Sequence, residues 1–142
     1  MNILIATDGS ELSRTAIDIG VGLAQSLGAS VLGVAAVPPN PYVALGGEQE
    51  PQLANFRAKM GALGNEHLSV VENAARAAGV PVQTLIREEE APHRAILSAA
   101  EQAGCDLIVL ASHGRAGIAT VLLGSETQKV LAFAAVPVLV VR

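Results

Sequence analysis

The sequence predicts an α/β domain, an open parallel β-sheet of five strands with helices on both faces. Five apolar segments alternate with four segments of helical periodicity, and strands joined by helices run parallel with right-handed crossovers. Hydrophobic residues make up 51% of the 142 residues, while aromatic residues make up only 2%. The core must therefore be aliphatic, as is typical of strands covered on both faces. Residues 1–142 are expected to form one domain.

The first strand is predicted over Asn2–Thr7, and Ser10 is a suitable N-cap for the helix that follows. Gly28 is placed to end that helix. Gly20 and Gly22 lie inside it, where glycine is unfavourable, and close packing on the sheet is the interpretation. Apolar residues at spacings of three and four predict its buried face, which consists of Leu12, Ala16, Ile19, Leu23 and Leu27.

A second strand is predicted over Ser30–Val37, followed by a proline-rich loop, Pro38–Pro51. A loop of this length in a compact domain is a functional flap or simply mobile. A long helix then ends before Gly79, and His67 falls on its apolar stripe, where a packed histidine near the core edge is expected. The stripe comprises Leu53, Phe56, Met60, Leu63, His67, Val71, Ala74 and Ala78.

The third strand, Pro81–Arg87, has weak alternation and a leading proline, which fit an edge position. Glu88–Glu90 reads as a solvated turn before a helix that begins at Pro92 and is ended by Gly104. His93, at the start of that helix, is expected to be an ordinary surface residue.

The last part of the chain carries the strongest functional signal. An apolar strand, Asp106–Ala111, leads into the glycine-bearing loop Ser112–Gly117; Gly124-Ser125 then opens a helix, and a final apolar strand spans Val136–Val141. Parallel sheets build anion sites in this way at their strand ends, because glycine loops and helix starts supply backbone N–H groups.

Ser125 has two interpretations. Its hydroxyl and the following N–H groups can donate to phosphate oxygens. Alternatively, Ser125 is a plain N-cap that forms a capping box with Gln128. One residue can serve both roles at different times.

Composition excludes several classes of function. The net charge of −4 and the pI near 5.3 argue against binding to nucleic acid or to an anionic membrane. The longest apolar run, Val130–Val141, contains Pro137 and is too short to span a bilayer. The N-terminus lacks the basic region of a signal peptide. The single cysteine, Cys105, is expected to be a buried filler in a reducing cytoplasm.

Three segments together resemble the universal stress protein family. They are Ile3–Ser10, Leu107–Gly117, and the closing stretch that contains Leu122–Ser125 and Val136–Val141. The resemblance covers essentially the whole chain and is weakest in the Pro38–Pro51 loop. The expected fold is an open sheet in strand order 3-2-1-4-5. The resemblance implies a stress-response regulatory protein that binds ATP, or ADP or AMP, with Mg²⁺ as a candidate companion.

Many members of that family bind ATP through the pattern G-x2-G-x9-G-[ST]. Here Gly114, Gly124 and Ser125 match it, and Ala111 stands in place of the first glycine. Alanine is tolerated if the backbone φ there is negative, whereas a positive φ, or packing of adenosine on the Cα atom, would weaken binding. The nucleotide-binding residues that the resemblance implies are Ala6, Thr7, Asp8, Val34, Leu110, Ala111, His113, Gly114, Arg115, Gly124, Ser125, Glu126 and Thr127.

The resemblance assigns parts of the nucleotide to these residues. Val34 would face the adenine, Ala6 to Asp8 would border adenosine and ribose, and residues 124–127 would hold the phosphates. Asp8 could bind Mg²⁺ or the ribose hydroxyls, or it could be a simple turn aspartate. His113 could contact the nucleotide or be an ordinary loop residue, and Arg115 could face solvent or a phosphate.

Three functions stay open at this point. The first is a nucleotide-binding regulator that switches contacts with an unidentified protein partner. The second is a slow Mg²⁺-dependent ATPase, although no Walker lysine pattern is present. The third is a nucleotide-free dimeric scaffold, which holds if Ala111 closes the site. A homodimer is expected through Val136–Val141, because an apolar edge strand needs cover and the family pairs its last strands across a two-fold axis.

Overall fold

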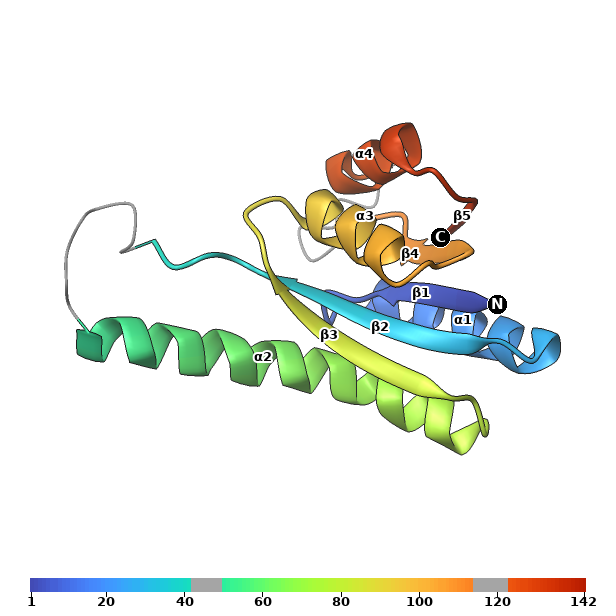
Figure 1. Ribbon diagram of the computed structural model, residues 1–142, viewed down its shortest axis with the longest axis horizontal. Helices are drawn as coiled ribbons and strands as arrows, with labels where there is room; N and C mark the ends of the chain where they lie inside the picture. Colours follow the sequence, from blue (N-terminus) through green and yellow to red (C-terminus); the bar gives the residue numbers. More distant parts are fainter. Residues whose placement is uncertain (42–49, 114–122) are drawn as a thin grey trace.

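Strands and helices alternate throughout the part of the chain that the computed structural model describes, residues 1–41, 50–113 and 123–142 (Figure 1). The elements are β1 (Asn2–Ala6), α1 (Glu11–Leu27), β2 (Ser30–Val37), α2 (Glu50–Ala77), β3 (Val82–Glu88), α3 (Pro92–Gln102), β4 (Leu107–Ala111), α4 (Ser125–Phe133) and β5 (Val138–Val141). All strand pairs are parallel, and the order is β3-β2-β1-β4-β5. The predicted fold class and strand order are confirmed.

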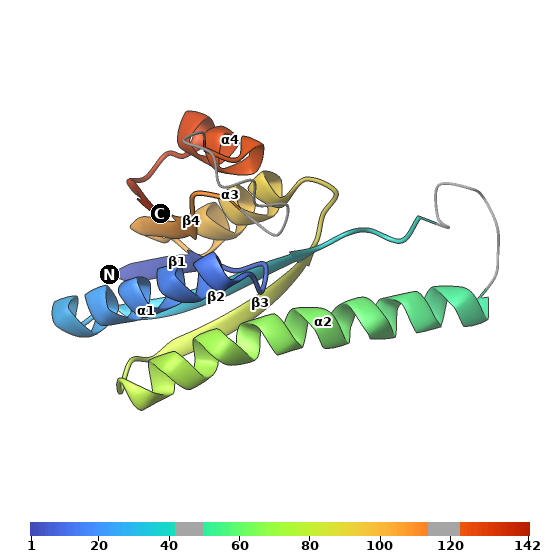
Figure 2. The same cartoon turned by 180° about the vertical axis from the view of Figure 1, so that it is seen from behind.

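The sheet is covered on both faces. Helices α1 and α2 lie on one face, and α3 and α4 lie on the other (Figures 1 and 2). Alternate residues of β1 point to opposite faces, so Ile3 and Ile5 join one aliphatic core cluster while Leu4 and Ala6 join the other. None of the helices that the structure describes has both the length and the apolar composition needed to cross a membrane.

Helix α1 begins and ends as its sequence predicts, but it buries a different face. Ser10 Oγ accepts a hydrogen bond from the Ser13 N–H at 3.2 Å, and Gly28 adopts a left-handed φ of 62° at the C-cap. The predicted apolar face is wrong in part: Ala16 is buried and Leu23 packs against the core, but Ile19 is 44% exposed and Leu27 is 52% exposed. The buried face consists of Ser13, Ala16, Ile17, Gly20, Val21 and Ala24.

Close packing explains why the small residues of α1 face the sheet. A Cβ atom on Gly20 would lie 2.7 Å from Ile5 Cδ1, so the helix sits nearer to β1 than a larger residue would allow. Gly20 therefore serves the packing role expected of it. Gly22 does not, since nothing lies within 4 Å of its Cβ position.

Helix α2 follows the predicted apolar stripe and extends beyond the sheet at its N-terminal end (Figure 1). Val71 is fully buried, and His67 is half-buried, as expected of a packed histidine. Residues 42–49 of the predicted Pro38–Pro51 loop lie outside the described residues. Cys105 is buried as predicted, and burial together with the neighbouring Asp106 charge raises the pKa of its thiol.

The two edges of the sheet are β3 and β5, as predicted. Strand β5 begins two residues later than expected, at Val138. Pro137 has no N–H to donate, but its carbonyl still accepts a hydrogen bond from the Ile108 N–H at 3.0 Å. The pairing of β5 with β4 thus starts at the proline carbonyl.

Candidate functional site

A cavity of about 130 Å³ opens at the carboxyl ends of β1, β2 and β4. The chain turns to opposite sides of the sheet after β1 and after β4, and ligands of open α/β sheets bind where the strand order reverses. Residues from both faces line it: Ala6, Thr7, Asp8, Ser13, Val34, Ala36, Pro92, Ile96, Leu110, Ala111, His113, Glu126 and Thr127.

Most residues that the sequence assigned to a nucleotide site therefore surround one cavity. Gly124 and Ser125 are not among the lining residues but begin α4 directly beside it. Gly114 and Arg115 lie outside the described residues. The structure thus brings the predicted strand ends together with the start of α4, while the ligand roles of the individual residues stay predictions.

Four lining residues were missed by the sequence analysis, namely Ser13, Ala36, Pro92 and Ile96. Pairing of β1 with β2 ends at Ala6 and Val34, and Ala36 comes next on that side of β2. The sequence indicated Ala36 through the length of the second apolar run, which continues beyond the residues that pair with β1. Pro92 and Ile96 come from α3, whose sequence shows only an amphipathic helix, so no local signal marked them.

The turn after β1 is held by a chain of hydroxyl groups. Ser13 Oγ donates to the Ser10 carbonyl at 2.8 Å, so the buried Thr7 hydroxyl donates in turn to Ser13 Oγ at 3.1 Å. The Gly9 N–H donates to Thr7 Oγ1 at 3.2 Å. These bonds fix the first residues of the turn at the floor of the cavity.

Asp8 follows in the same turn, and its Oδ1 accepts a hydrogen bond from the Ser10 N–H at 3.0 Å. Gly9 has a φ of 77°, which favours glycine, and the ring of His67 lies where a Cβ would point, with Nε2 only 2.3 Å from that position. Among the described residues, no three His, Cys, Asp or Glu side chains gather to hold a metal ion. A Mg²⁺ ion at Asp8 would need oxygen ligands from a bound phosphate.

The end of β4 is joined directly to the start of α4. Thr127 Oγ1 donates to the Ala111 carbonyl at 3.0 Å, and the Gly124 N–H donates to the Ser112 carbonyl at 2.7 Å. A Cβ on Gly124 would lie 3.3 Å from both Ser112 O and His113 Cα. A side chain at this position would press against a second backbone segment, so the close approach favours glycine.

The predicted capping box at α4 is wrong. The N-cap is Gly124 rather than Ser125, and no side chain caps the helix. Gln128 instead reaches back two residues beyond Ser125, so that its Nε2 donates to the Leu123 carbonyl at 2.7 Å. The backbone N–H groups at the start of α4 thus have no capping side chain, which is the arrangement that receives anions in other proteins.

Ala111 fits the backbone at the first position of the glycine pattern. None of the described non-glycine residues has a positive φ, and Ala111 pairs with Val141 as the last residue of β4. The methyl group is therefore tolerated by the strand. Next to it, Ser112 Oγ and His113 Nδ1 lie 3.1 Å apart, which gives the His113 ring a fixed partner.

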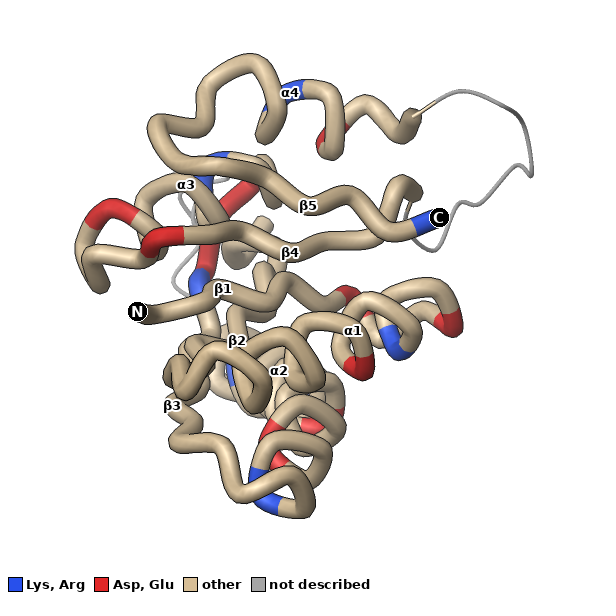
Figure 3. Tube along the Cα trace, turned by 90° about the vertical axis from the view of Figure 1, so that its right-hand side faces the viewer, with Lys and Arg blue, Asp and Glu red and all other residues tan. Residues whose placement is uncertain are grey.

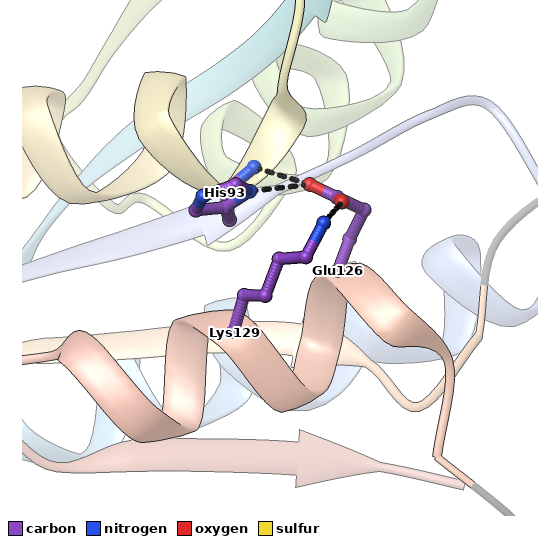
Figure 4. Close-up of polar contacts among 3 residues, drawn as sticks. All are labelled: His93, Glu126 and Lys129. Carbon is purple, nitrogen blue, oxygen red and sulfur yellow. Dashed lines mark hydrogen bonds and ion pairs between the residues drawn. The ribbon is translucent and has the colours of Figure 1, made fainter.

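His93 is not the plain surface residue that was expected. Its side chain is 14% exposed, and its ring Nδ1 lies 2.8 Å from Glu126 Oε2 (Figure 4). The same oxygen accepts the His93 backbone N–H at 2.8 Å, while Lys129 Nζ donates to Glu126 Oε1 at 2.9 Å. A carboxylate from α4 thereby accepts one N–H of the first turn of α3, where the N-cap Ala91 offers no side-chain acceptor.

The environment of Glu126 keeps its carboxylate ionised. Partial burial acts to raise its pKa, but hydrogen bonds from Lys129 and from the His93 backbone and ring outweigh burial and lower the pKa to about 2. The cavity wall therefore carries a fixed negative charge with a paired cation beside it.

Comparison with known proteins adds the family context. The family model described as the universal stress protein family matches residues 1–142. A universal stress protein of Methanocaldococcus jannaschii is 34% identical over 140 residues, which cover 99% of this chain and 81% of that protein.

Solved structures of the same family share the fold. A universal stress protein from Lactobacillus plantarum superposes with a TM-score of 0.83 at 25% identity, covering 100% of this chain and 97% of that one. A universal stress protein solved in complex with cAMP has a TM-score of 0.72 at 25% identity, covering 100% of this chain and 96% of the other.

Proposed function

This chain belongs to the universal stress protein family, and we propose that it is a regulatory protein that binds an adenine nucleotide, ATP foremost, in the cavity between β1, β2 and β4. The observation that carries the proposal is that an apolar cavity opens beside a helix start without a capping side chain. The relative solved with cAMP supports the same class of ligand.

The adenine ring fits the apolar part of the cavity. Val34, Ile96 and Leu110 offer aliphatic walls from two strands and from α3. The Val34 carbonyl is already bonded to the Thr7 N–H at 3.0 Å, so Val34 contributes surface rather than a polar contact. Ala36, the next residue on that side of β2, offers backbone groups beyond the end of β1 to hydrogen-bond the edge of the base.

The sugar and phosphates fit the polar side. Asp8 lines the cavity and would accept hydrogen bonds from ribose hydroxyls or bind a Mg²⁺ ion that accompanies the phosphates. The N–H groups at the start of α4 have no capping side chain and belong to the turn that contributes Glu126 and Thr127 to the cavity lining, so they would receive phosphate oxygens. Mg²⁺, if bound, would supply charge neutralisation for the phosphates.

Binding without rapid turnover is the form of activity that we propose. A phosphate site made of backbone N–H groups holds the ground state and the transition state similarly, and uniform binding does not raise the rate of transfer. The alternative, a slow Mg²⁺-dependent ATPase, depends on Asp8. Phosphate release at about 1 per second or faster, which is within the ordinary range for enzymes, would favour that alternative.

Calorimetry with ATP, with and without Mg²⁺, tests the proposal. We expect micromolar binding by the wild-type protein, about −8 kcal/mol, and loss of binding in Gly124→Val. The reason is that a side chain there collides with the backbone of Ser112 and His113 and displaces the start of α4.

Gly22→Val is the matched control, since nothing lies near the Gly22 Cβ position and the residue is exposed on α1. Absence of heat and of a thermal shift with millimolar ATP in the wild-type protein would contradict the proposal. It would leave the nucleotide-free scaffold as the better account. Mass spectrometry of the native protein as purified, in search of retained nucleotide, gives an independent check.

A further inference from the structure

Glu126 holds a negative charge at a fixed place on the cavity wall, between the first turns of α3 and α4 (Figure 4). One carboxylate oxygen accepts both hydrogen bonds from His93, and the other accepts the hydrogen bond from Lys129. If the carboxylate rotated away, the His93 N–H would lose its acceptor, because the N-cap Ala91 makes no side-chain hydrogen bond. The charge is therefore held in place by three donors.

The described part of the cavity wall has an acidic bias. Its ionisable side chains are Asp8, His113 and Glu126, two of which are carboxylates. Lys129 is the cation paired with Glu126, but it does not line the cavity and its side chain is 47% exposed. A ligand with several negative charges therefore meets the Glu126 carboxylate as well as the uncapped start of α4.

We propose that Glu126 is a specificity-determining residue whose charge opposes anionic groups on the α3 side of the cavity and so limits how strongly the site favours polyphosphates. The inference rests on the proposed function, since the ligand concerned is an adenine nucleotide. The Glu126 carboxylate accepts the His93 N–H in the first turn of α3 and so acts there as an anion supplied by the protein itself. The first turn of α4 is left as the end that receives the ligand phosphates.

Lys129 sets the strength of this effect. Its ammonium group compensates part of the Glu126 charge through the contact at 2.9 Å. Removing the carboxylate deletes the repulsion and also frees the lysine. Removing the lysine leaves the carboxylate without its counter-charge. The two changes should therefore move the affinity for a polyphosphate in opposite directions.

Calorimetry on the full chain with ATP and with uncharged adenosine measures the effect as a ratio of affinities. Glu126→Gln retains the size of the side chain and an acceptor oxygen for His93. We expect it to raise the ATP-to-adenosine affinity ratio about fivefold or more at low salt, with a smaller gain at high salt. Lys129→Gln should lower the ratio.

Glu72→Gln is the matched control. Glu72 also pairs with a cation on its own helix, Arg76 at 3.8 Å, and accepts a hydrogen bond from Thr84, but it does not line the cavity. The ATP-to-adenosine affinity ratio of Glu72→Gln should equal that of the wild type.

The outcomes separate the inference from the proposed function. A ratio that is the same in the wild type, Glu126→Gln and Lys129→Gln, with ATP still bound, overturns the inference alone. A fall of the ratio in Glu126→Gln also overturns it. Absence of binding of both ligands to the wild type overturns the proposed function and the inference with it.

Discussion

At the scale of single residues, Glu126 links two helices that are far apart in the sequence. It belongs to the first turn of α4, yet its carboxylate accepts the N–H of His93 in the first turn of α3. Helix starts leave N–H groups without intrahelical partners, and a carboxylate near them is favourable through both hydrogen bonding and the helix dipole. One side chain therefore stabilises α3 and also charges the cavity wall.

The stability of the protein should depend on pH through Glu126. Its pKa is lowered from 4.5 to about 2 in the folded protein, so its contribution is fully present above the unfolded value and is lost as pH falls toward 2. Because the side chain is 35% exposed, the contribution is expected to be at most about 1 kcal/mol. Urea unfolding should show the advantage of the wild type over Glu126→Gln shrinking between pH 6 and pH 3. An advantage independent of pH would contradict this.

Sequence patterns predicted well which residues gather at the cavity. They predicted less well which hydrogen bonds these residues make. Glycine and serine spacing correctly identified the junction of β4 and α4 at Gly124. The capping box failed because a Ser-x-x-Gln pattern does not specify which of two adjacent residues is the N-cap. His93 was misjudged because its partner is 33 residues away and on another helix. No local spacing reports such a contact.

At the scale of elements, α1 shows how close packing can override an apolar pattern. Leucine and isoleucine at helical spacing predicted one face, but the helix buries the face that carries Gly20, Ala16 and Ala24. Hydrophobic periodicity measures only which residues avoid water. It does not register that small residues let a helix approach a flat parallel sheet, where more atoms come into contact.

The two glycines inside α1 should respond differently to the same substitution. Gly22→Ala should raise the free energy of unfolding by about 0.5–1 kcal/mol, because alanine restricts the unfolded chain and its methyl group meets nothing. At Gly20 a methyl group would lie 2.7 Å from Ile5 Cδ1, which is fully buried and must shift. Gly20→Ala should therefore lose that gain to overpacking. Equal gains in chemical denaturation would show that α1 can move away from the sheet at no cost.

At the scale of the whole molecule, the sequence pattern predicted the parallel α/β sheet because each level of the pattern agreed, and the family resemblance supplied the strand order. Apolar strands, helical segments and glycine stops alternate regularly, and right-handed crossovers leave few arrangements for such a chain. The sequence did not predict which further residues of β2 and α3 line the cavity. Ala36, Pro92 and Ile96 reach the cavity only through the packing of β2 and α3 against the strand ends.

The same topology leaves β5 as an apolar edge. Strand β5 pairs with β4 on one side, and no strand of the described sheet lies on its other side. Figure 3 shows that its length carries no charged residue before Arg142, so the charges that usually protect an edge are lacking. Leu139, 36% exposed, lies in the middle of this strand. Such an edge favours association with a second copy through the same strand.

We therefore predict a homodimer formed through β5, and Leu139→Lys should shift it toward the monomer. A charge at the centre of a two-fold contact meets its own copy across the axis, and like charges directly opposite each other are destabilising. Leu139 is a better position for this test than its neighbour Val140, because Val140 packs against the core cluster beneath α4.

Leu27→Lys is the control, since Leu27 is 52% exposed at the end of α1. Light scattering at micromolar concentrations should report a dimer mass for the wild type and the control and a lower mass for Leu139→Lys. A monomer mass for the wild type would instead mean that this edge stays single in solution.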